Sequence, residues 1–217
     1  MQRDSYYLVD LVFCFDNSLS SRILLREFQE LSKQFTEDFC SRMMETDRLP
    51  KTTRVRALSV GKENDNTIFT ETPFFHLPKG WQAMDKFLDE IRLKSFSTAL
   101  EPIDELWLIA KAILSNWNTD TTVLKKRQII YYFKGYSSNQ EPSEHFDSFL
   151  DILTDLWYKD LVMDNSGKRM IIIAPDSVPF SKISNEWEDV IHYPIQEHFS
   201  LNEDFYNLII NSSVRSV

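Results

Sequence analysis

Two kinds of hydrophobic pattern alternate along this chain. Short runs in which almost every residue is apolar occur at Tyr7 to Phe15, at Gln128 to Phe133 and at Met170 to Ala174. Runs of this length and density are typical of β-strands that are covered on both faces. Between them lie longer segments in which apolar residues recur every three or four positions, the spacing of one helical face. The alternation predicts an α/β protein with a mainly parallel sheet and right-handed crossovers.

The helical stripes divide the rest of the chain into predicted helices. The third helix is expected to open at Pro102, because proline suits the first turn of a helix. A short helix is also predicted near Lys182, and a closing helix near the end of the chain. The apolar positions are Leu24, Phe28, Leu31, Phe35 and Phe39 in the first helix, Met84, Phe87, Leu88 and Ile91 in the second (Trp81 to Leu93), Ile103, Leu106, Ala110, Ile113 and Trp117 in the third, Phe146, Phe149, Leu153, Leu156 and Trp157 in the fourth, and Phe205, Leu208 and Ile209 in the last.

Weaker signals complete the predicted sheet. Val55 to Val60 can form a strand, and Thr67 to Thr70 can pair back on it as a short antiparallel edge strand. Pro73 to Pro78 cannot be a regular helix, and Asp189 to His192 is predicted as the last strand. We therefore expect one domain over residues 1–217, with three layers and a doubly wound, mainly parallel six-stranded sheet that has one short antiparallel edge strand.

Composition limits the class of partner and the location. The chain has 217 residues and a formal net charge of -9, with acidic residues spread throughout, so nucleic acid and anionic lipid are not expected as partners. Its 2 cysteines do not make a disulfide framework. Because no apolar run approaches the roughly 20 residues that cross a bilayer, a cytoplasmic protein is expected.

The residues that follow the first strand are the best candidates for chemistry. Asp16, Ser18 and Ser20 place a carboxylate and two hydroxyls on one strand-to-helix turn, and such oxygens suit magnesium. The same residue types are also preferred caps of a helix, and a helix is predicted to begin here. None of the 4 glycines belongs to a phosphate-binding loop, so nucleotide binding by a known loop is not expected.

Other reactive residue types do not form a predicted catalytic centre. The 4 histidines stand in separate elements and are interpreted as structural, and Cys14 is interpreted as a small hydrophobe within a buried strand. Tyr131 and Tyr132 are expected in the core. The adjacent carboxylates Asp104 and Glu105 point in different directions on a helix, so they are predicted to lie on a solvated face. No catalytic residue is predicted.

Several segments together resemble a known family. The run LVDLVFCFDNSLS resembles the first strand and DxSxS turn of von Willebrand factor A (vWA) domains. Four further segments are similar to the bacterial branch of that family represented by the tellurium-resistance protein TerY, and the resemblance covers nearly the whole chain. These segments are Glu71 to Pro78, Glu101-Pro102, Arg127 to Ile130, and Ala174 to Pro194.

The resemblance implies a degenerate metal-ion-dependent adhesion site. Asp16, Ser18 and Ser20 match the DxSxS ligands of the family. The ligand before the third helix falls on Leu100, with Thr98 as the nearby hydroxyl, and the acidic ligand after the fourth strand becomes Lys134. We expect Lys134 to pair with Asp16 in place of a cation, which leaves the site without metal. In the alternative, Lys134 extends into solvent and Asp16 only caps the first helix.

The resemblance also implies a function. We expect a non-catalytic protein-interaction module in a bacterial stress or defence signalling complex, with a kinase-like or phosphatase protein as partner. Its binding face would lie at the carboxyl ends of the strands, around Asn17, Leu100, Lys134 and Tyr136. The alternatives are a vWA domain with a working magnesium site, or a metal-dependent hydrolase that processes phosphate esters.

Overall fold

The computed structural model describes residues 7–18, 21–22, 25–28, 52–64, 66–77, 79–94, 100–117, 125–135, 144–164, 167–176 and 178–195. The strands within these ranges are β1 (Tyr7–Asp16), β2 (Thr52–Glu63), β3 (Asn66–Glu71), β4 (Phe75–His76), β5 (Lys125–Phe133), β6 (Gly167–Ala174) and β7 (Val190–Pro194). The helices are α2 (Lys79–Leu93), α3 (Pro102–Ile113), α4 (Phe146–Asp164) and α5 (Val178–Glu186).

These strands form one mainly parallel sheet, as the alternating pattern predicts. Their order is β3-β2-β1-β5-β6-β7, with β4 paired to β2, and only β3 and β4 run antiparallel to the strand they join. The described residues therefore give a 7-stranded sheet where six strands were expected. The additional strand is β4, two residues long, from the proline-flanked segment for which only a regular helix was excluded.

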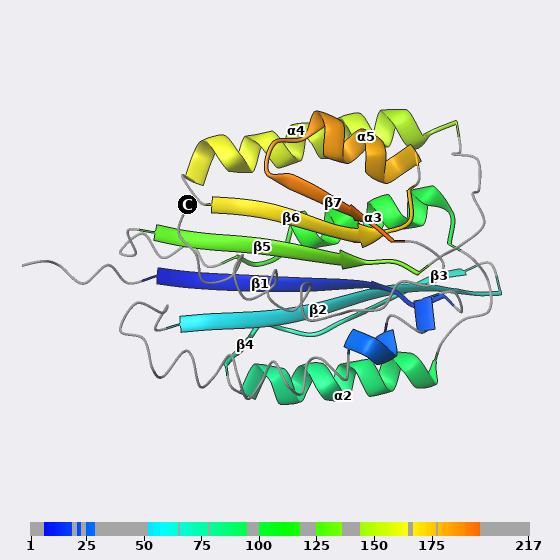
Figure 1. Ribbon diagram of the computed structural model, residues 1–217, viewed down its shortest axis with the longest axis vertical. Helices are drawn as coiled ribbons and strands as arrows, with labels where there is room; N and C mark the ends of the chain where they lie inside the picture. Colours follow the sequence, from blue (N-terminus) through cyan, green and yellow to red (C-terminus); the bar gives the residue numbers. More distant parts are fainter. Residues whose placement is uncertain are drawn as a thin grey trace, which may run out of the picture.

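β1 lies at the centre of the sheet because both of its faces are apolar. It pairs in parallel with β2 on one side and β5 on the other, so that Phe13 stands beside Ala57 and Tyr131. Successive side chains point to opposite faces. Phe13 and Phe15 belong to the core that α2 covers, whereas Val12 and Cys14 belong to the core under α3, α4 and α5. Figure 1 shows α2 on one side of the sheet and α4 and α5 on the other.

Cys14 and Tyr132 confirm two expectations about buried side chains. Both are fully buried in the core beneath α3, α4 and α5, as is Tyr131 in the opposite core. Burial raises the pKa of the Cys14 thiol, which the charge of Arg56 lowers in part. Cys14 is therefore a protonated core side chain.

The end of α3 differs from the expected one, whereas the described part of the first helix agrees with the prediction. α3 opens at Pro102 as predicted but ends at Ile113, so Trp117 lies beyond the helix, where its indole N–H donates to the Ile113 carbonyl at 2.9 Å. Of the predicted first helix, the described residues 25–28 are helical, and Phe28 packs against Phe13 and Phe15. The remainder of that helix and the predicted closing helix lie outside the described residues.

A close contact between α2 and β2 depends on a glycine. A Cβ atom on Gly80 would lie 2.4 Å from Cγ2 of Val55 and 3.0 Å from the carbonyl oxygen of Phe75. Both distances are shorter than a normal van der Waals contact. Gly80 therefore permits the first turn of α2 to approach the start of β2.

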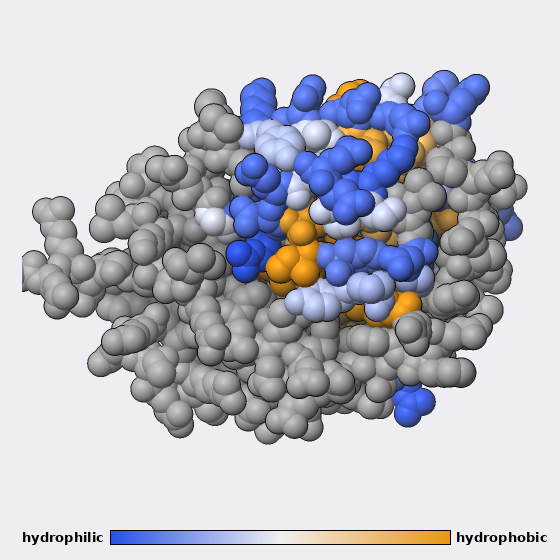
Figure 2. Space-filling model, turned by 45° about the horizontal axis from the view of Figure 1, so that its top comes forward, coloured by the Kyte–Doolittle hydropathy of each residue, from blue (hydrophilic) through white to orange (hydrophobic). Residues whose placement is uncertain are grey.

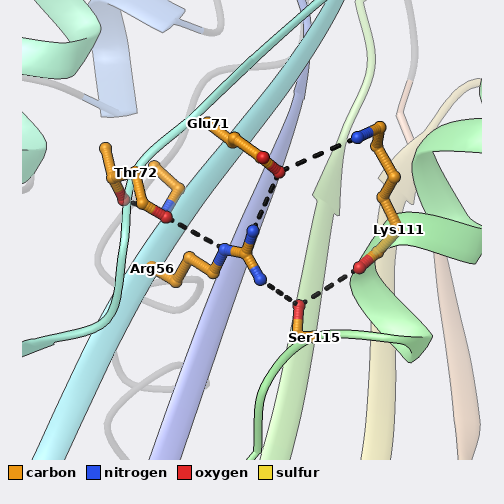
Figure 3. Close-up of polar contacts among 6 residues, drawn as sticks. Arg56, Glu71, Thr72, Lys111 and Ser115 are labelled. Atoms are coloured by element: carbon orange, nitrogen blue, oxygen red, sulfur yellow. Dashed lines mark hydrogen bonds and ion pairs between the residues drawn. The ribbon is translucent and has the colours of Figure 1, made fainter.

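Arg56 joins three elements at the C-terminal end of α3 (Figure 3). Its guanidinium donates from Nε to the carbonyl oxygen of Thr72 at 2.9 Å, from Nη2 to Glu71 at 2.8 Å and from Nη1 to Ser115 Oγ at 3.2 Å. The Lys111 amine adds an ion pair with Glu71 at 3.8 Å. The planar fork of the guanidinium holds β2, the end of β3 and the end of α3 in a fixed arrangement.

Candidate functional site

Asp16 ends β1 and is buried beneath the turn that follows. Its Oδ1 accepts a hydrogen bond from the Ser18 backbone N–H at 2.7 Å. Its Oδ2 accepts from the hydroxyls of Ser18 at 2.9 Å and Ser21 at 2.7 Å. The Ser21 oxygen in turn accepts from the Gly135 backbone N–H at 2.7 Å. Ser21 thus ties the end of β1 to the residues that leave β5.

Lys134 makes its ion pair with Glu105, and not with Asp16 as expected. The Lys134 amine donates to Oε1 of Glu105, and both side chains are almost completely buried. Burial raises the pKa of Asp16 and the nearby Lys134 charge opposes that rise, but the Asp16 oxygens are occupied by the backbone and hydroxyl donors of the turn. The expected pairing was therefore wrong in its direct partner, and the alternative in which Lys134 extends into solvent is also wrong.

The first turn of α3 places Glu105 beneath the carboxyl ends of the strands. The backbone N–H of Glu101 donates to Oδ2 of Asp104 at 3.1 Å, and the Thr67 hydroxyl donates to Oδ1 of Asp104 at 2.7 Å. Asp104 and Glu105 are both buried, which corrects the prediction of a solvated face. Asp104 fastens α3 to β3, and Glu105 points to Lys134.

Burial dominates the ionisation of the two carboxyl groups near Lys134. Burial raises the pKa of Glu105 to about 7, although the attraction and hydrogen bond of Lys134 oppose the shift. Burial likewise raises the pKa of Asp16, against the charge of Lys134 and the hydrogen bonds of Ser21 and Ser18. After burial, the charges of Asp16 and Asp104 add to the rise in the pKa of Glu105, so one ammonium lies beside more than one buried acid.

Buried polar atoms without a hydrogen-bond partner gather around this cluster. They include Oε2 of Glu105, Oδ1 of Asn17 and the hydroxyl of Tyr132. Burial and then the charge of Glu105 raise the pKa of the Tyr132 hydroxyl well above its ordinary value, so the phenol is neutral. Unpartnered buried polar atoms are uncommon in folded proteins and are often found at functional sites. We refer to Asp16, Glu105, Tyr132 and Lys134 as the apical cluster.

The apical cluster fits a divalent cation poorly. The oxygens of Asp16 already accept three hydrogen bonds, and the buried Lys134 ammonium is paired with the carboxylate of Glu105. A divalent cation and the Lys134 ammonium would repel each other strongly in the same buried site. Across the described part of the chain, no group of three or more His, Cys, Asp or Glu side chains is arranged to hold a metal ion.

The other residues expected at the site fall into two groups. Asn17 and Leu100 are buried, and Leu100 belongs to the core beneath α3 rather than to the surface. Ser20, Thr98 and Tyr136 lie outside the described residues. The structure thus brings together Asp16, Ser18 and Lys134 from the expected set.

Glu105 and Ser21 belong to the site but were not among the expected residues. The sequence contains a pattern that indicates burial of Glu105. This residue stands three, four and seven positions before the apolar residues Leu108, Ile109 and Ala112, which lie on one buried helical face. A carboxylate on such a face needs a buried partner. Ser21 directly follows the DxSxS turn and carried no comparable signal.

Comparison with known proteins supports the fold. No protein-family model matches the chain, and the curated proteins gave no match. Two crystal structures of the pilus adhesin SpaC from Lactobacillus rhamnosus GG resemble it, with TM-scores of 0.53 and 0.51 at 11% identity. These likenesses cover 95% of this chain but only 30% and 29% of the adhesin chain. The human COPII-coat protein Sec24c gives a TM-score of 0.47 at 11% identity, over 94% of this chain and 32% of that one.

The likeness to the adhesin structures concerns the fold alone, and the mainly parallel sheet is consistent with a Rossmann-like or vWA-like α/β arrangement. Carboxyl ends of parallel strands are the usual location of binding sites in such sheets. The apical cluster lies at this edge, since Asp16 ends β1 and Lys134 directly follows β5. Within the described ranges, no helix has the length and apolar character needed to cross a membrane.

Proposed function

We propose that this chain is a non-catalytic protein-interaction module that acts through the carboxyl-end edge of its sheet. In this proposal Lys134 supplies the positive charge that a divalent cation would otherwise bring. The observation that carries the proposal is the buried Lys134 ammonium, paired with Glu105 and close enough to Asp16 for its charge to oppose the rise that burial causes in the pKa of Asp16. One ammonium between two acids neutralises one full charge and can remain there without an exchangeable ion.

The geometry gives the binding face a fixed base. Ser21 connects the residues that follow β1 to those that follow β5, and Glu105 connects the start of α3 to the same place through Lys134. Loops carried by a rigid scaffold are the usual location of binding residues. The proposed face lies at this edge around Asn17 and Gly135, and Tyr136, which is also expected there, lies outside the described residues.

Burial also favours binding over catalysis. Asp16 and Glu105 have about 1% of their surface exposed, so neither can reach a substrate without movement of the turn above it. A general acid or base must come within hydrogen-bond reach of the proton that it transfers. We propose that these carboxyl groups orient the face and do not perform chemistry.

The proposed partner is a protein of the kinase-like or phosphatase class, in a cytoplasmic complex of bacterial stress or defence signalling. This part of the proposal depends on the resemblance to the TerY branch. The net charge of -9 favours a protein partner over nucleic acid or anionic membrane.

A metal titration tests the role of Lys134. Thermal unfolding is followed in the presence of increasing Mg²⁺ or Mn²⁺ for the natural chain, for Lys134→Asp and for Lys79→Asp, an exposed control beside β4. Specific binding to the native state raises the melting temperature in a saturable manner. We expect such a rise only in Lys134→Asp. A saturable rise in the natural chain that Asp16→Asn removes would show a working metal site instead.

A binding measurement tests the proposed face. The neighbouring genes are searched for kinase-like and phosphatase proteins, and the affinities of the purified proteins for the natural chain, Tyr136→Ala and Lys79→Ala are compared. We expect one of them to bind, with an affinity that falls at least tenfold in Tyr136→Ala, about 1.4 kcal/mol, and stays unchanged in Lys79→Ala. Magnesium-dependent hydrolysis of a phosphate ester that disappears in Asp16→Asn would contradict the proposal.

A further inference from the structure

The outer face of α3 and α4 exposes large apolar side chains. Trp107 on α3 is 51% exposed and Ile152 on α4 is 55% exposed. The ring of Trp107 lies 4.5 Å from the ring of Phe149, which is one helical turn before Ile152 on α4. Leu114, at the end of α3, is 63% exposed. We refer to Trp107, Leu114, Phe149 and Ile152 as the α3–α4 patch.

The position of the patch makes its exposure informative. Most residues of α3 are buried, which leaves a narrow outer strip with Ile103, Trp107 and Lys111, followed by Leu114. One or two polar residues would be enough to make so narrow a strip hydrophilic. The strip instead exposes tryptophan and leucine. Exposed tryptophan is typical of binding surfaces, because one side chain supplies a large contact area at small entropic cost.

The rim of the patch is acidic. Asp147, Asp151 and Asp155 recur every four positions along α4 and are exposed, with Lys159 as the basic residue one turn further on. Asp147 already pairs with Lys182 of α5 at 2.5 Å. Figure 2, which brings the side with α4 and α5 forward, shows a mostly hydrophilic surface with small hydrophobic areas between. Asp151 and Asp155 thus present negative charge beside Ile152.

This charge selects among occupants of the patch. A second copy of the chain would place the same aspartates against each other, and like charges across an interface oppose association. Nucleic acid and anionic lipid would be repelled for the same reason. A protein segment with apolar residues on one helical face and lysine or arginine beside them would bury the apolar groups and pair with the aspartates.

We propose that the α3–α4 patch is a second docking surface, which takes a basic amphipathic helix of a partner protein. The partner's apolar side chains contact Trp107, Phe149 and Ile152, and its basic side chains face Asp151 and Asp155. The patch is built on helices and not on the loops of the carboxyl-end edge. The inference therefore does not depend on the proposed function of that edge.

A pair of synthetic peptides tests the proposal. Both are labelled amphipathic helices with leucine at the apolar positions, one with lysine and the other with glutamate at the flanking positions. Fluorescence anisotropy is measured with the natural chain, with Trp107→Ala/Ile152→Ser, with Asp151→Lys/Asp155→Lys and with the α2 control Lys86→Ala. Circular dichroism confirms that each variant is folded.

We expect the lysine peptide to bind the natural chain and Lys86→Ala equally. Its affinity should fall at least tenfold in Trp107→Ala/Ile152→Ser and in Asp151→Lys/Asp155→Lys, and it should weaken as salt is raised. The proposal is overturned if the lysine peptide does not bind at 1 mM, if the two peptides bind equally, or if the patch variants leave binding unchanged. Dimerisation that Ile152→Ser abolishes would assign the patch to a second copy and overturn it as well.

Discussion

Two polar networks stand at the two ends of α3, and they are built differently. At the C-terminal end, Arg56 donates to three acceptors on different elements, and Glu71 and Lys111 at its edge are partly exposed. At the N-terminal end, Lys134 pairs with one oxygen of Glu105, while the other oxygen of that carboxylate is buried without a partner. The first network has matched partners, and the second combines buried charge with unmatched atoms.

The difference separates a structural network from a candidate site. A guanidinium that joins strands and a helix stabilises the fold, and its donors already have acceptors. In a buried acid pair with one ammonium, the charges interact strongly because little water screens them. The unmatched carboxylate oxygen can accept a hydrogen bond from a binding partner or from water. Conflict with local rules of burial and pairing is expected mainly at functional positions.

Removal of the Lys134 charge should produce the largest loss of stability. Lys134→Met leaves Glu105 and Asp16 buried without an ammonium, and breaking one partner of a buried pair costs about 3–5 kcal/mol. Urea unfolding followed by tryptophan fluorescence measures the change. The double variant Lys134→Met/Glu105→Gln should recover part of the loss. Equal stability of the natural chain and Lys134→Met would show that the pair of Lys134 and Glu105 makes no net contribution to the free energy of unfolding.

The stability of the natural chain should fall as pH rises from about 4.5 to about 7. Burial raises the pKa of Glu105 from 4.5 to about 7 in the folded chain, with Lys134 opposing and with Asp16 and Asp104 adding to the rise. The folded state therefore binds the proton more tightly, and its contribution is complete below pH 4.5 and lost between pH 4.5 and 7. The shift corresponds to about 3 kcal/mol.

The pH test compares the natural chain with Glu105→Gln, which cannot ionise at this position. The difference between their free energies of unfolding should change with pH between about 4.5 and 7 and stay constant above that range. Glu90→Gln, an exposed carboxyl on α2 away from the apical cluster, serves as the control. Parallel pH profiles of the natural chain and Glu105→Gln would rule out Glu105 as the titrating group.

Loss of the Ser21 hydroxyl should have an intermediate effect. Ser21→Ala removes the donor to Asp16 and leaves the Gly135 N–H without its acceptor, and one unsatisfied buried group costs about 1–3 kcal/mol. The expected loss in urea unfolding is about 2 kcal/mol. Ser184→Ala, whose hydroxyl donates to the carbonyl of Ser181 in α5, is the control and should lose less.

Removal of the Arg56 side-chain network should have the smallest effect of the four. Arg56→Met retains the apolar stem, and water can reach the partly exposed partners Glu71 and Lys111 that remain. We expect a loss of about 1 kcal/mol in urea unfolding. Arg92→Ala, which breaks an exposed pair with Asp89 on α2, should change stability by less than about 0.5 kcal/mol. A larger loss for Arg56→Met than for Lys134→Met would reverse the comparison between the two networks.

The sequence allowed most of the fold to be predicted, because its strands and helices have distinct periods. The apolar run of β1 indicated a strand covered on both faces, and the stripes from Met84 to Ile91 and from Phe146 to Trp157 indicated helices that pack one face inward. β4 was not predicted, since two residues between prolines have no period. The end of α3 was placed too late because Trp117 continues the helical spacing, although it packs from beyond the helix.

The apical cluster was predicted only in part, because the spacing of residues along the chain does not determine which side chain pairs with Lys134. The positions of Asp16 and Lys134 at the ends of neighbouring strands followed from the order of elements and the resemblance to vWA domains. The partner of Lys134 depends on how α3 is rotated against the sheet, which Asp104 fixes through its contacts with Thr67 and Glu101. The contact with Thr67 joins residues distant in sequence, and only the folded arrangement reveals it.

Cys14 lies in the central strand with no exposed surface, so its thiol can serve as a clock for opening of the sheet. Alkylating reagents attack the thiolate, and in the native chain both access and ionisation are suppressed at this position. In a Cys40→Ser background, the labelling rate of Cys14 would report how often the middle of the molecule comes apart. A thiol that does not react in the folded chain thereby measures how often the sheet opens.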